Sequence, residues 1–183
     1  MEDLSLHILD IMQNSAEHGA DTIVLRIEEN AGDDLLTISI LDNGSGMDES
    51  AAARVTDPFY TSKDKRVGLG VPLFKQAALA AGGSFSIDSQ AGKGTVIEAS
   101  FDYSNIDRQP LGNVVDTVIS ILIAYPHLRI VYTHVKDGQE AAFDSEDFME
   151  RAATAEGGTA EYAVLSLMKG EWESRLGEIG AGE

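Results

Sequence analysis

Hydrophobic and polar residues alternate with two different periods along the first part of the chain. Apolar residues recur every three or four positions over residues 3–18, which predicts an amphipathic helix ended by Gly19. The spacing changes to near-alternation at 22–28 and again at 36–41, so two half-buried strands are expected there. The polar residues at 30–34 form the turn between them. The chain therefore begins with a helix and a β-hairpin.

The same two periods continue toward the C-terminus. They predict further helices at 48–55, 72–81, 110–124, 144–155 and 159–176, and further strands at 84–89, 94–101, 128–135 and 140–143. In the first of the two hairpins that these strands form, the inward side chains are expected to be Phe85, Ile87, Val96 and Phe101. The last helix has an apolar stripe, and the tail 177–183 is expected to be disordered. The stripe consists of Leu165, Met168, Trp172 and Leu176.

Length and composition are those of a folded globular protein. The 183 residues fit one domain of ordinary size with an appendage, or two small domains. Hydrophobic residues make up 43% of the chain and charged residues 24%, so the chain can build a core.

Three features that the sequence lacks restrict the cellular compartment in which the protein is expected. The longest apolar run, 114–125, is interrupted by polar residues, so no membrane span is expected. Glu2 and Asp3 stand where a signal peptide would carry Lys or Arg. The chain has no cysteine, which excludes disulfides, thiolate metal sites and cysteine nucleophiles. We therefore expect a cytoplasmic protein without a membrane partner.

Acidic residues dominate the charge. The formal net charge of −18 at pH 7 disfavours nucleic acid or an anionic membrane as a partner of the whole surface. Against this background, Lys63, Lys65 and Arg66 form a short basic cluster. The cluster is either a solvated loop or a patch of positive potential for a phosphate.

A loop of the form D-x-G-x-G closes the second strand. Asp42 lies at the strand end, where its carboxylate can accept a hydrogen bond from an exocyclic amine such as that of adenine. Gly44 and Gly46 lack Cβ atoms, so the backbone lets a flat ligand approach closely. The same residue types also form ordinary surface turns. By itself the loop therefore predicts either a turn or the base of a nucleotide pocket.

One face of the first helix carries polar residues at intervals of four. Asp10, Asn14 and His18 follow one another on this face. Asn is a poor helix former, and in mid-helix it has no local benefit unless its amide oxygen is used. A solvated outer face is the alternative.

A second glycine-rich stretch comes before the helix at 72–81. Gly68 and Gly70 leave backbone N–H groups free near the helix start, and these groups together with the helix dipole form an anion site. Pro72 suits the first helical turn, where its missing N–H costs nothing. Because the basic cluster directly precedes this stretch, we expect phosphate binding here.

Taken in order, these features resemble the GHKL class of ATP-binding domains, which includes gyrase, the heat-shock chaperones of that class, histidine kinases and MutL. Five motifs carry the resemblance over residues 3–102. They are the asparagine box at 10–20, the first glycine box at 42–46, the phenylalanine box of histidine kinases at 57–63, the second glycine box at 68–71 and the terminal G-K-G-T at 92–95.

The resemblance implies an α/β fold. It would be a two-layer α/β sandwich of the GHKL (Bergerat) type, with helices on one face of a mixed sheet. Residues 1–103 would form the ATP-binding domain, and 104–183 a small α/β C-terminal extension of unknown role. The implied cofactors are ATP and Mg²⁺.

The resemblance also implies roles for single residues. Asn14 would bind Mg²⁺ through its amide oxygen, with phosphates and water completing the shell. Asp42 would bind the adenine amine, supported by Thr95. Asp10 lies one turn before Asn14, where family members often carry a catalytic Glu, and it would orient a water or a hydroxyl for attack on the γ-phosphate. The other residues expected at the nucleotide are His18, Gly44, Gly46, Met47, Phe59, Thr61, Lys63, Gly68, Leu69, Gly70 and Val71.

Three functions are compatible with this resemblance. The first is a kinase that transfers the γ-phosphate to a separate protein partner, because no part of the chain resembles the phospho-accepting helix pair of a histidine kinase. The motifs at 57–63 and 92–95 favour it. The second is an ATPase switch that controls formation of a homodimer, favoured by the same absence of a phospho-accepting helix pair and by residues 14–21, which are closer to MutL. The third is a nucleotide sensor without hydrolysis.

Two departures from the family pattern bear on this choice. Val67 replaces the first glycine that is common in the kinase form of the second glycine box, so the hinge of the lid is expected to be stiffer. Asp10 is one methylene shorter than Glu, which shortens its reach toward a phosphate.

Overall fold

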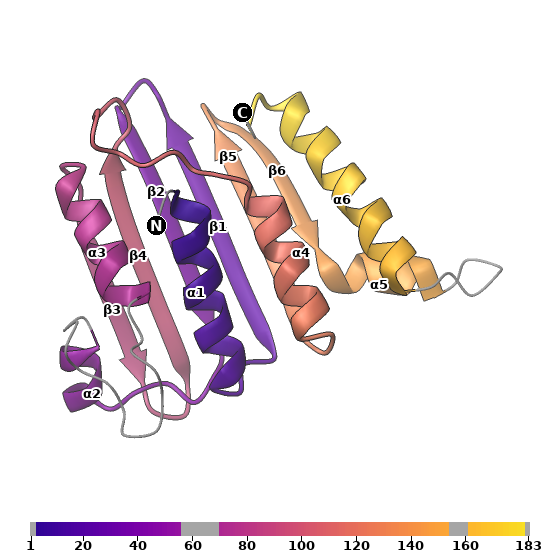
Figure 1. Ribbon diagram of the computed structural model, residues 1–183, viewed down its shortest axis with the longest axis horizontal. Helices are drawn as coiled ribbons and strands as arrows, with labels where there is room; N and C mark the ends of the chain where they lie inside the picture. The colour runs from indigo at the N-terminus through magenta and orange to yellow at the C-terminus, as the bar shows by residue number, and fades with distance from the viewer. Residues whose placement is uncertain (1–2, 56–69, 154–160, 182–183) are drawn as a thin grey trace.

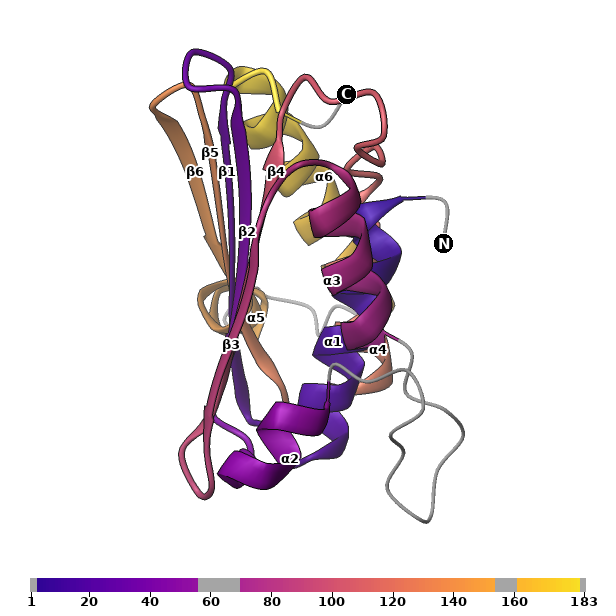
Figure 2. The ribbon, with the colours of Figure 1, turned by 90° about the vertical axis from the view of Figure 1, so that its left-hand side faces the viewer.

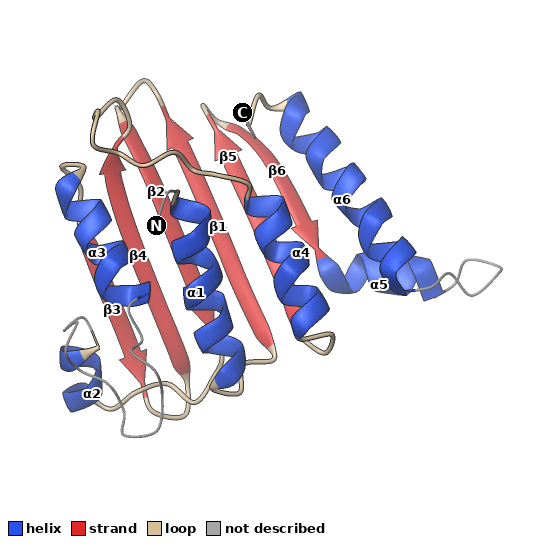
Figure 3. Cartoon of the chain, viewed as in Figure 1, coloured by secondary structure: helices blue, strands red, loops and turns tan. Residues whose placement is uncertain are grey.

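The computed structural model describes residues 3–55, 70–153 and 161–181. Six strands form one mixed sheet, and helices pack on one face of it (Figures 1 and 2). Figure 3 separates the two layers by colour, with the strands red and the helices blue. The predicted class, a two-layer α/β sandwich, is confirmed.

The elements lie where the hydrophobic pattern predicts them. The helices are α1 (Leu4–Glu17), α2 (Glu49–Arg54), α3 (Gly70–Ala80), α4 (Val114–Ala124), α5 (Ser145–Ala153) and α6 (Glu161–Glu178). The strands are β1 (Thr22–Asn30), β2 (Leu35–Asp42), β3 (Phe85–Gln90), β4 (Gly94–Asp102), β5 (Arg129–Lys136) and β6 (Gln139–Asp144). Most boundaries differ from the predicted ones by a residue or two.

The helix predicted from residue 110 begins later, at Val114. Asn113 caps it, because its side-chain oxygen accepts a hydrogen bond of 2.9 Å from the backbone N–H of Asp116. The carbonyls of Pro110 and Leu111 accept instead from the first amides of α1. Pro110 and Leu111 thus provide hydrogen-bond acceptors for two free N–H groups at the N-terminus of α1. The local sequence pattern does not reveal this contact.

The sheet has the strand order β3-β4-β2-β1-β5-β6. β1 pairs antiparallel with β2 on one side and parallel with β5 on the other. The strands after residue 104 therefore continue the sheet that the N-terminal strands begin, as Figure 1 shows. The division of the chain into 1–103 and 104–183 stays a prediction.

The core lies between the sheet and the helices. Ile8 and Met12 of α1 are fully buried, as is Leu25 on β1. Toward the C-terminus, the rings of Trp172 on α6 and Phe143 on β6 lie 4.9 Å apart between centroids. The predicted apolar stripe of α6 is confirmed, since none of its four residues is more than 6% exposed.

One predicted face is wrong in the hairpin of β3 and β4. β4 directs Ile97, Ala99 and Phe101 into the core, where Val96 was expected to accompany Phe101. Successive side chains of a strand point to opposite faces, so residues 96 and 101 cannot share one.

The expected disorder of the tail 177–183 is also wrong as far as Ala181. This residue is only 4% exposed, and its backbone N–H donates to the carbonyl of Leu176 at 2.9 Å. The carbonyl of Gly180 accepts a hydrogen bond from the ammonium group of Lys136. The end of α6 is therefore attached to the turn between β5 and β6.

Candidate functional site

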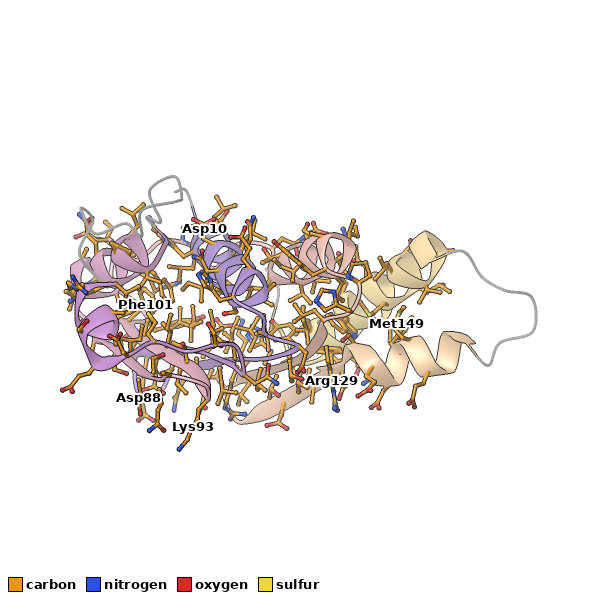
Figure 4. All side chains as sticks on the ribbon, turned by 90° about the horizontal axis from the view of Figure 1, so that it is seen from below. Asp10, Asp88, Lys93, Phe101, Arg129 and Met149 are labelled. Atoms are coloured by element: carbon orange, nitrogen blue, oxygen red, sulfur yellow. The ribbon has the colours of Figure 1, made fainter. Side chains whose placement is uncertain are left out.

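Four segments that carry predicted site residues meet at one end of the sheet, the lower end in Figure 1. They are the second half of α1, the loop after β2, the β3–β4 turn and the first residues of α3. Figure 4 views the molecule from this end and shows Asp10 on the helix layer and Lys93 at the turn on the strand layer.

The carboxylate of Asp42 is held in one orientation at the end of β2. Its Oδ2 accepts a hydrogen bond of 2.8 Å from the hydroxyl of Ser15 on α1, and its Oδ1 accepts one of 2.9 Å from the backbone N–H of Gly44. Thr95 of β4 is the residue directly opposite Asp42 in the sheet. Ser15 is a site residue that the sequence did not reveal, because its place on the apolar side of α1 indicated packing only.

A second hydroxyl orders the loop after β2. The hydroxyl of Ser89 lies 2.8 Å from that of Thr95 and accepts a hydrogen bond of 2.9 Å from the backbone N–H of Met47. Thr95 and Met47, which were both predicted at the nucleotide, are thus connected through Ser89. The sequence could have indicated Ser89 only through the register of the hairpin, in which it lies opposite Thr95.

The glycines of the first glycine box have a packing role in this arrangement. Gly46 has a positive φ of 60°, and a Cβ there would lie 2.1 Å from the carbonyl oxygen of Gln90. A Cβ on Gly44 would lie 3.0 Å from Oδ1 of Asp42. Both residues let the loop lie close against its neighbours, and the expected approach of an adenine ring to them stays a prediction.

Asn14 and His18 lie on the polar face of α1, as the spacing predicts. In the part of the chain that the structure describes, the amide of Asn14 has no hydrogen-bond partner. His18 is exposed at the end of the helix, with Nδ1 2.7 Å from the carbonyl oxygen of Asn14. As far as the described residues go, the Asn14 side chain is therefore available to a ligand.

A cation at Asn14 would take few ligands from the protein. Over residues 3–55, 70–153 and 161–181, no group of three His, Cys, Asp or Glu side chains could hold a metal ion. A single amide oxygen nevertheless fits Mg²⁺, which usually keeps several waters and binds through one or two protein ligands and the phosphates of a nucleotide.

Asp10 lies where α1 contacts the beginning of α3. A Cβ on Gly70 would lie 2.7 Å from the Cβ of Asp10, so a glycine is needed for this close approach. Val71 beside it is 8% exposed. Burial raises the pKa of the Asp10 carboxyl above its ordinary value, while the charge of His7 acts in the opposite direction. Asp10 thus has the half-buried position and the altered acidity of a candidate general base.

The remaining predicted site residues lie outside the described residues. They are Phe59, Thr61, Lys63, Gly68 and Leu69, and the basic cluster is in the same segment.

Comparison with known families identifies the class of this chain. Residues 2–105 match the family model described as "Histidine kinase-, DNA gyrase B-, and HSP90-like ATPase". The match spans more than half of the chain, so the chain belongs to this family. The resemblance to GHKL proteins that the motifs predict is confirmed.

Two curated relatives that resemble this chain are much longer proteins. Sporulation kinase D of Bacillus subtilis (strain 168) is 32% identical over 102 residues, which are 54% of this chain and 20% of that protein. Sporulation kinase C of the same organism is 38% identical over 61 residues, which are 33% of this chain and 14% of that protein. The chain thus spans a fifth or less of these relatives.

A solved structure described as the N-terminal domain of a DNA repair protein shares the fold. Its TM-score is 0.53 at 16% identity, and the match covers 78% of this chain and 52% of that one. No helix in the described ranges is long and apolar enough to cross a membrane.

Proposed function

We propose that this chain binds ATP together with Mg²⁺ and transfers the γ-phosphate to a separate protein. The observation that carries the nucleotide part is the fixed carboxylate of Asp42. Each of its oxygens accepts one hydrogen bond from the protein, from Ser15 or from Gly44, and keeps capacity for another. A carboxylate held in this way can accept a hydrogen bond from the amine of adenine.

The available amide of Asn14 supports the metal part of the proposal. It lies on α1 one turn from Asp10, on the face that Gly70 approaches. Mg²⁺ bound there would supply positive charge to the phosphates during transfer. Asn14 would hold the ion and thereby position the phosphates beside Asp10.

Asp10 is proposed to accept the proton of the attacking group. Its carboxylate oxygen would take a proton from a hydroxyl, an imidazole or a water, so that the freed oxygen or nitrogen can attack phosphorus. The raised pKa of Asp10 favours this role, because a base works best when its pKa approaches the pH of the reaction. The attacking group belongs to the partner in a kinase, and it is water in an ATPase.

Transfer to a protein is proposed over hydrolysis because of the phenylalanine-box and G-K-G-T motifs and because both of the curated relatives described above are named kinases. The alternatives are an ATPase switch that controls a homodimer and a sensor that binds nucleotide without using it. All three share the site and differ in the fate of the γ-phosphate once ATP is bound.

Nucleotide binding is tested first, by melting the chain with Mg²⁺ and either ATP or GTP. At a ligand concentration 100 times Kd, stability increases by about 2.7 kcal/mol, so ATP should raise the Tm clearly. GTP should raise it much less, because guanine presents a carbonyl where adenine presents the amine. Equal increases with ATP and GTP would remove this role from Asp42.

The fate of the phosphate is tested with γ-labelled ATP. The chain is incubated alone and with a cell extract, in its natural form and as Asp10→Asn. A labelled protein that appears only with the extract supports the kinase, and release of phosphate by the chain alone supports the ATPase. Asp10→Asn should keep ATP binding and slow either reaction at least about tenfold. Binding without label transfer or release in both conditions would leave only the sensor.

A further inference from the structure

A groove lies beside the free edge of β6, far from the nucleotide site. Its floor is made of three buried aromatic residues, Phe143, Phe148 and Trp172. Its acidic rim comes from β6 and α5, with Asp147, Glu150 and Asp144, the last of which is paired with Arg129. Glu171 and Arg175 of α6 line the opposite side. None of the predicted nucleotide residues that the structure describes lines it.

The backbone of β6 faces this groove with groups that pair with no other strand in the described part of the chain. β6 is the last strand of the sheet, and its pairing partner among the described strands is β5. The two strands are joined by the turn residues Asp137 and Gly138, both with positive φ, which are typical of a two-residue hairpin. In such a hairpin the pairs alternate in hydrogen bonding, so Ala142, opposite Thr133, directs its N–H and its carbonyl outward.

One side chain of the protein already uses this edge. Nη1 of Arg175 lies 3.5 Å from the carbonyl oxygen of Ala142, and Nη2 donates to Glu171 at 2.6 Å. The guanidinium carbon lies 5.8 Å from the centre of the Phe143 ring. An arginine thus satisfies an edge carbonyl, an acidic side chain and an aromatic face at once.

From these contacts we propose that the edge of β6 binds a short, extended and basic segment of a partner protein, which adds to the sheet as a strand. The outward groups of Ala142 provide the backbone pairing, and the small side chain of this residue leaves room for it. Basic side chains of the segment would lie against the acidic rim, in the manner that Arg175 does within the chain.

The charge of this part of the chain identifies the segment as basic. Residues 137–183 contain twelve acidic residues and three basic ones. Such an excess of negative charge attracts a cationic segment and repels an acidic one. It therefore favours a basic partner and increases the rate of association with it.

The proposal is tested with a fluorescent octapeptide of alternating lysine and valine, measured by fluorescence anisotropy at low salt and without nucleotide. A peptide of alternating glutamate and valine is not expected to bind. A lysine–valine peptide with every backbone nitrogen methylated cannot donate to the edge, and it should bind at least about tenfold more weakly. Equal binding of the methylated peptide would overturn strand addition.

Two double variants distinguish the effect of the groove residues on peptide binding from the effect of the net charge of the chain. Asp147→Asn together with Glu150→Gln should weaken binding at least about fivefold. Asp88→Asn together with Glu98→Gln removes the same charge from exposed positions on β3 and β4 and should change binding less than about twofold. Equal losses in the two double variants would overturn the proposal.

Arg175 provides a second test in the opposite direction. Arg175→Ala frees the carbonyl of Ala142 and should strengthen peptide binding by about threefold. Lys169→Ala removes the same charge from α6 at a residue paired with Asp116, away from the groove, and should have a smaller effect. If Lys169→Ala strengthened binding as much as Arg175→Ala, the edge contact would not be involved.

The other occupant that could cover this edge is a second copy of the chain. Sedimentation of the chain and of Ala142→Pro distinguishes the two cases, because proline removes only an outward N–H. A monomer in both forms agrees with a basic partner. A dimer that Ala142→Pro converts to a monomer would show that β6 pairs with itself and would overturn the proposal.

Discussion

Asn43 and Asp21 are joined by two reciprocal hydrogen bonds. The backbone N–H of Asp21 donates to Oδ1 of Asn43 at 3.1 Å, and Nδ2 of Asn43 donates to Oδ1 of Asp21 at 2.6 Å. The carbonyl of Asp21 in turn accepts from the backbone N–H of Arg129 at 2.9 Å. The loop that carries Asp42 is thereby connected through Asp21 to the first residue of β5.

Asn43→Ala is expected to lower the free energy of unfolding by about 1–2 kcal/mol, because three hydrogen bonds to its side chain are lost. Exchange of the Arg129 amide hydrogen should become faster, since Asp21 loses its attachment to the loop. Urea unfolding and hydrogen exchange measure the two effects. Asn30→Ala is the control, because among the described residues the Asn30 side chain bonds only to Asp33 in its own turn. The same change in Arg129 exchange with both variants would contradict this connection.

Gly94→Ala is expected to displace Asp42 and to destabilise the chain by more than about 3 kcal/mol, because backbone strain and overpacking add. Gly94 has a φ of 106°, and its Cβ would lie 1.9 Å from the carbonyl oxygen of Asp42. Gly92 also has a positive φ, but a Cβ there would meet no atom within 4 Å. Gly92→Ala should therefore cost only the backbone strain, about 1–2 kcal/mol. Thermal unfolding measures the difference, and equal losses would mean that the close approach to Asp42 is easily relieved.

His7 should make the stability fall in mild acid. It is 2% exposed, its Nε2 lies 3.0 Å from Oε1 of Gln109, and its Nδ1 has no partner in the described structure. Burial lowers its pKa below the ordinary value, so the unfolded chain takes up a proton first as the pH falls. The contribution of His7 is thus fully present above about pH 6.5, the ordinary histidine pKa, and is lost below it.

His7→Phe keeps a ring beside Phe74 and removes this titration. The free energy of unfolding, measured by urea between pH 7 and 5, should decline less steeply in this variant than in the natural chain. His127→Gln, a change at an exposed histidine, is the control variant. An unchanged slope in His7→Phe would show that His7 is protonated as easily in the fold as in the unfolded chain.

Asp10→Asn should stabilise the fold at neutral pH, although it should slow the proposed transfer or release of the γ-phosphate. Because burial raises the pKa of Asp10, the folded chain binds its proton more tightly than the unfolded chain. The charged carboxylate therefore costs stability above its pKa in the fold, and this cost disappears as the pH falls below the ordinary value of 3.8. The Tm difference between the variant and the natural chain should be positive at pH 7 and shrink toward pH 4. A lower Tm at pH 7 would mean that the carboxylate makes contacts that the amide cannot replace.

The local elements and the loop of Asp42 could be predicted from the sequence because their signals are local. The period of apolar residues defines α1 and β2, and the glycines mark the loop between β2 and α2. Ser15 and Ser89 could not be predicted, because their importance depends on which residue lies opposite them in space. Val96 was placed on the wrong face because the strand had apolar residues on both faces, and only its register with β2 decides between them.

The parallel pairing of β1 with β5 has a consequence for how the chain is made. Glu29 and His134 lie 105 positions apart in the sequence and are hydrogen-bonded at 2.7 Å. A ribosome adds about 5–20 residues per second, so β1 emerges roughly 5–20 s before its partner. During this interval the β1 strand of the nascent hairpin has an unpaired edge, and such an edge can pair with other incomplete chains and aggregate. Folding of this protein during synthesis is therefore expected to require protection of the β1 edge until β5 has left the ribosome and can pair with it.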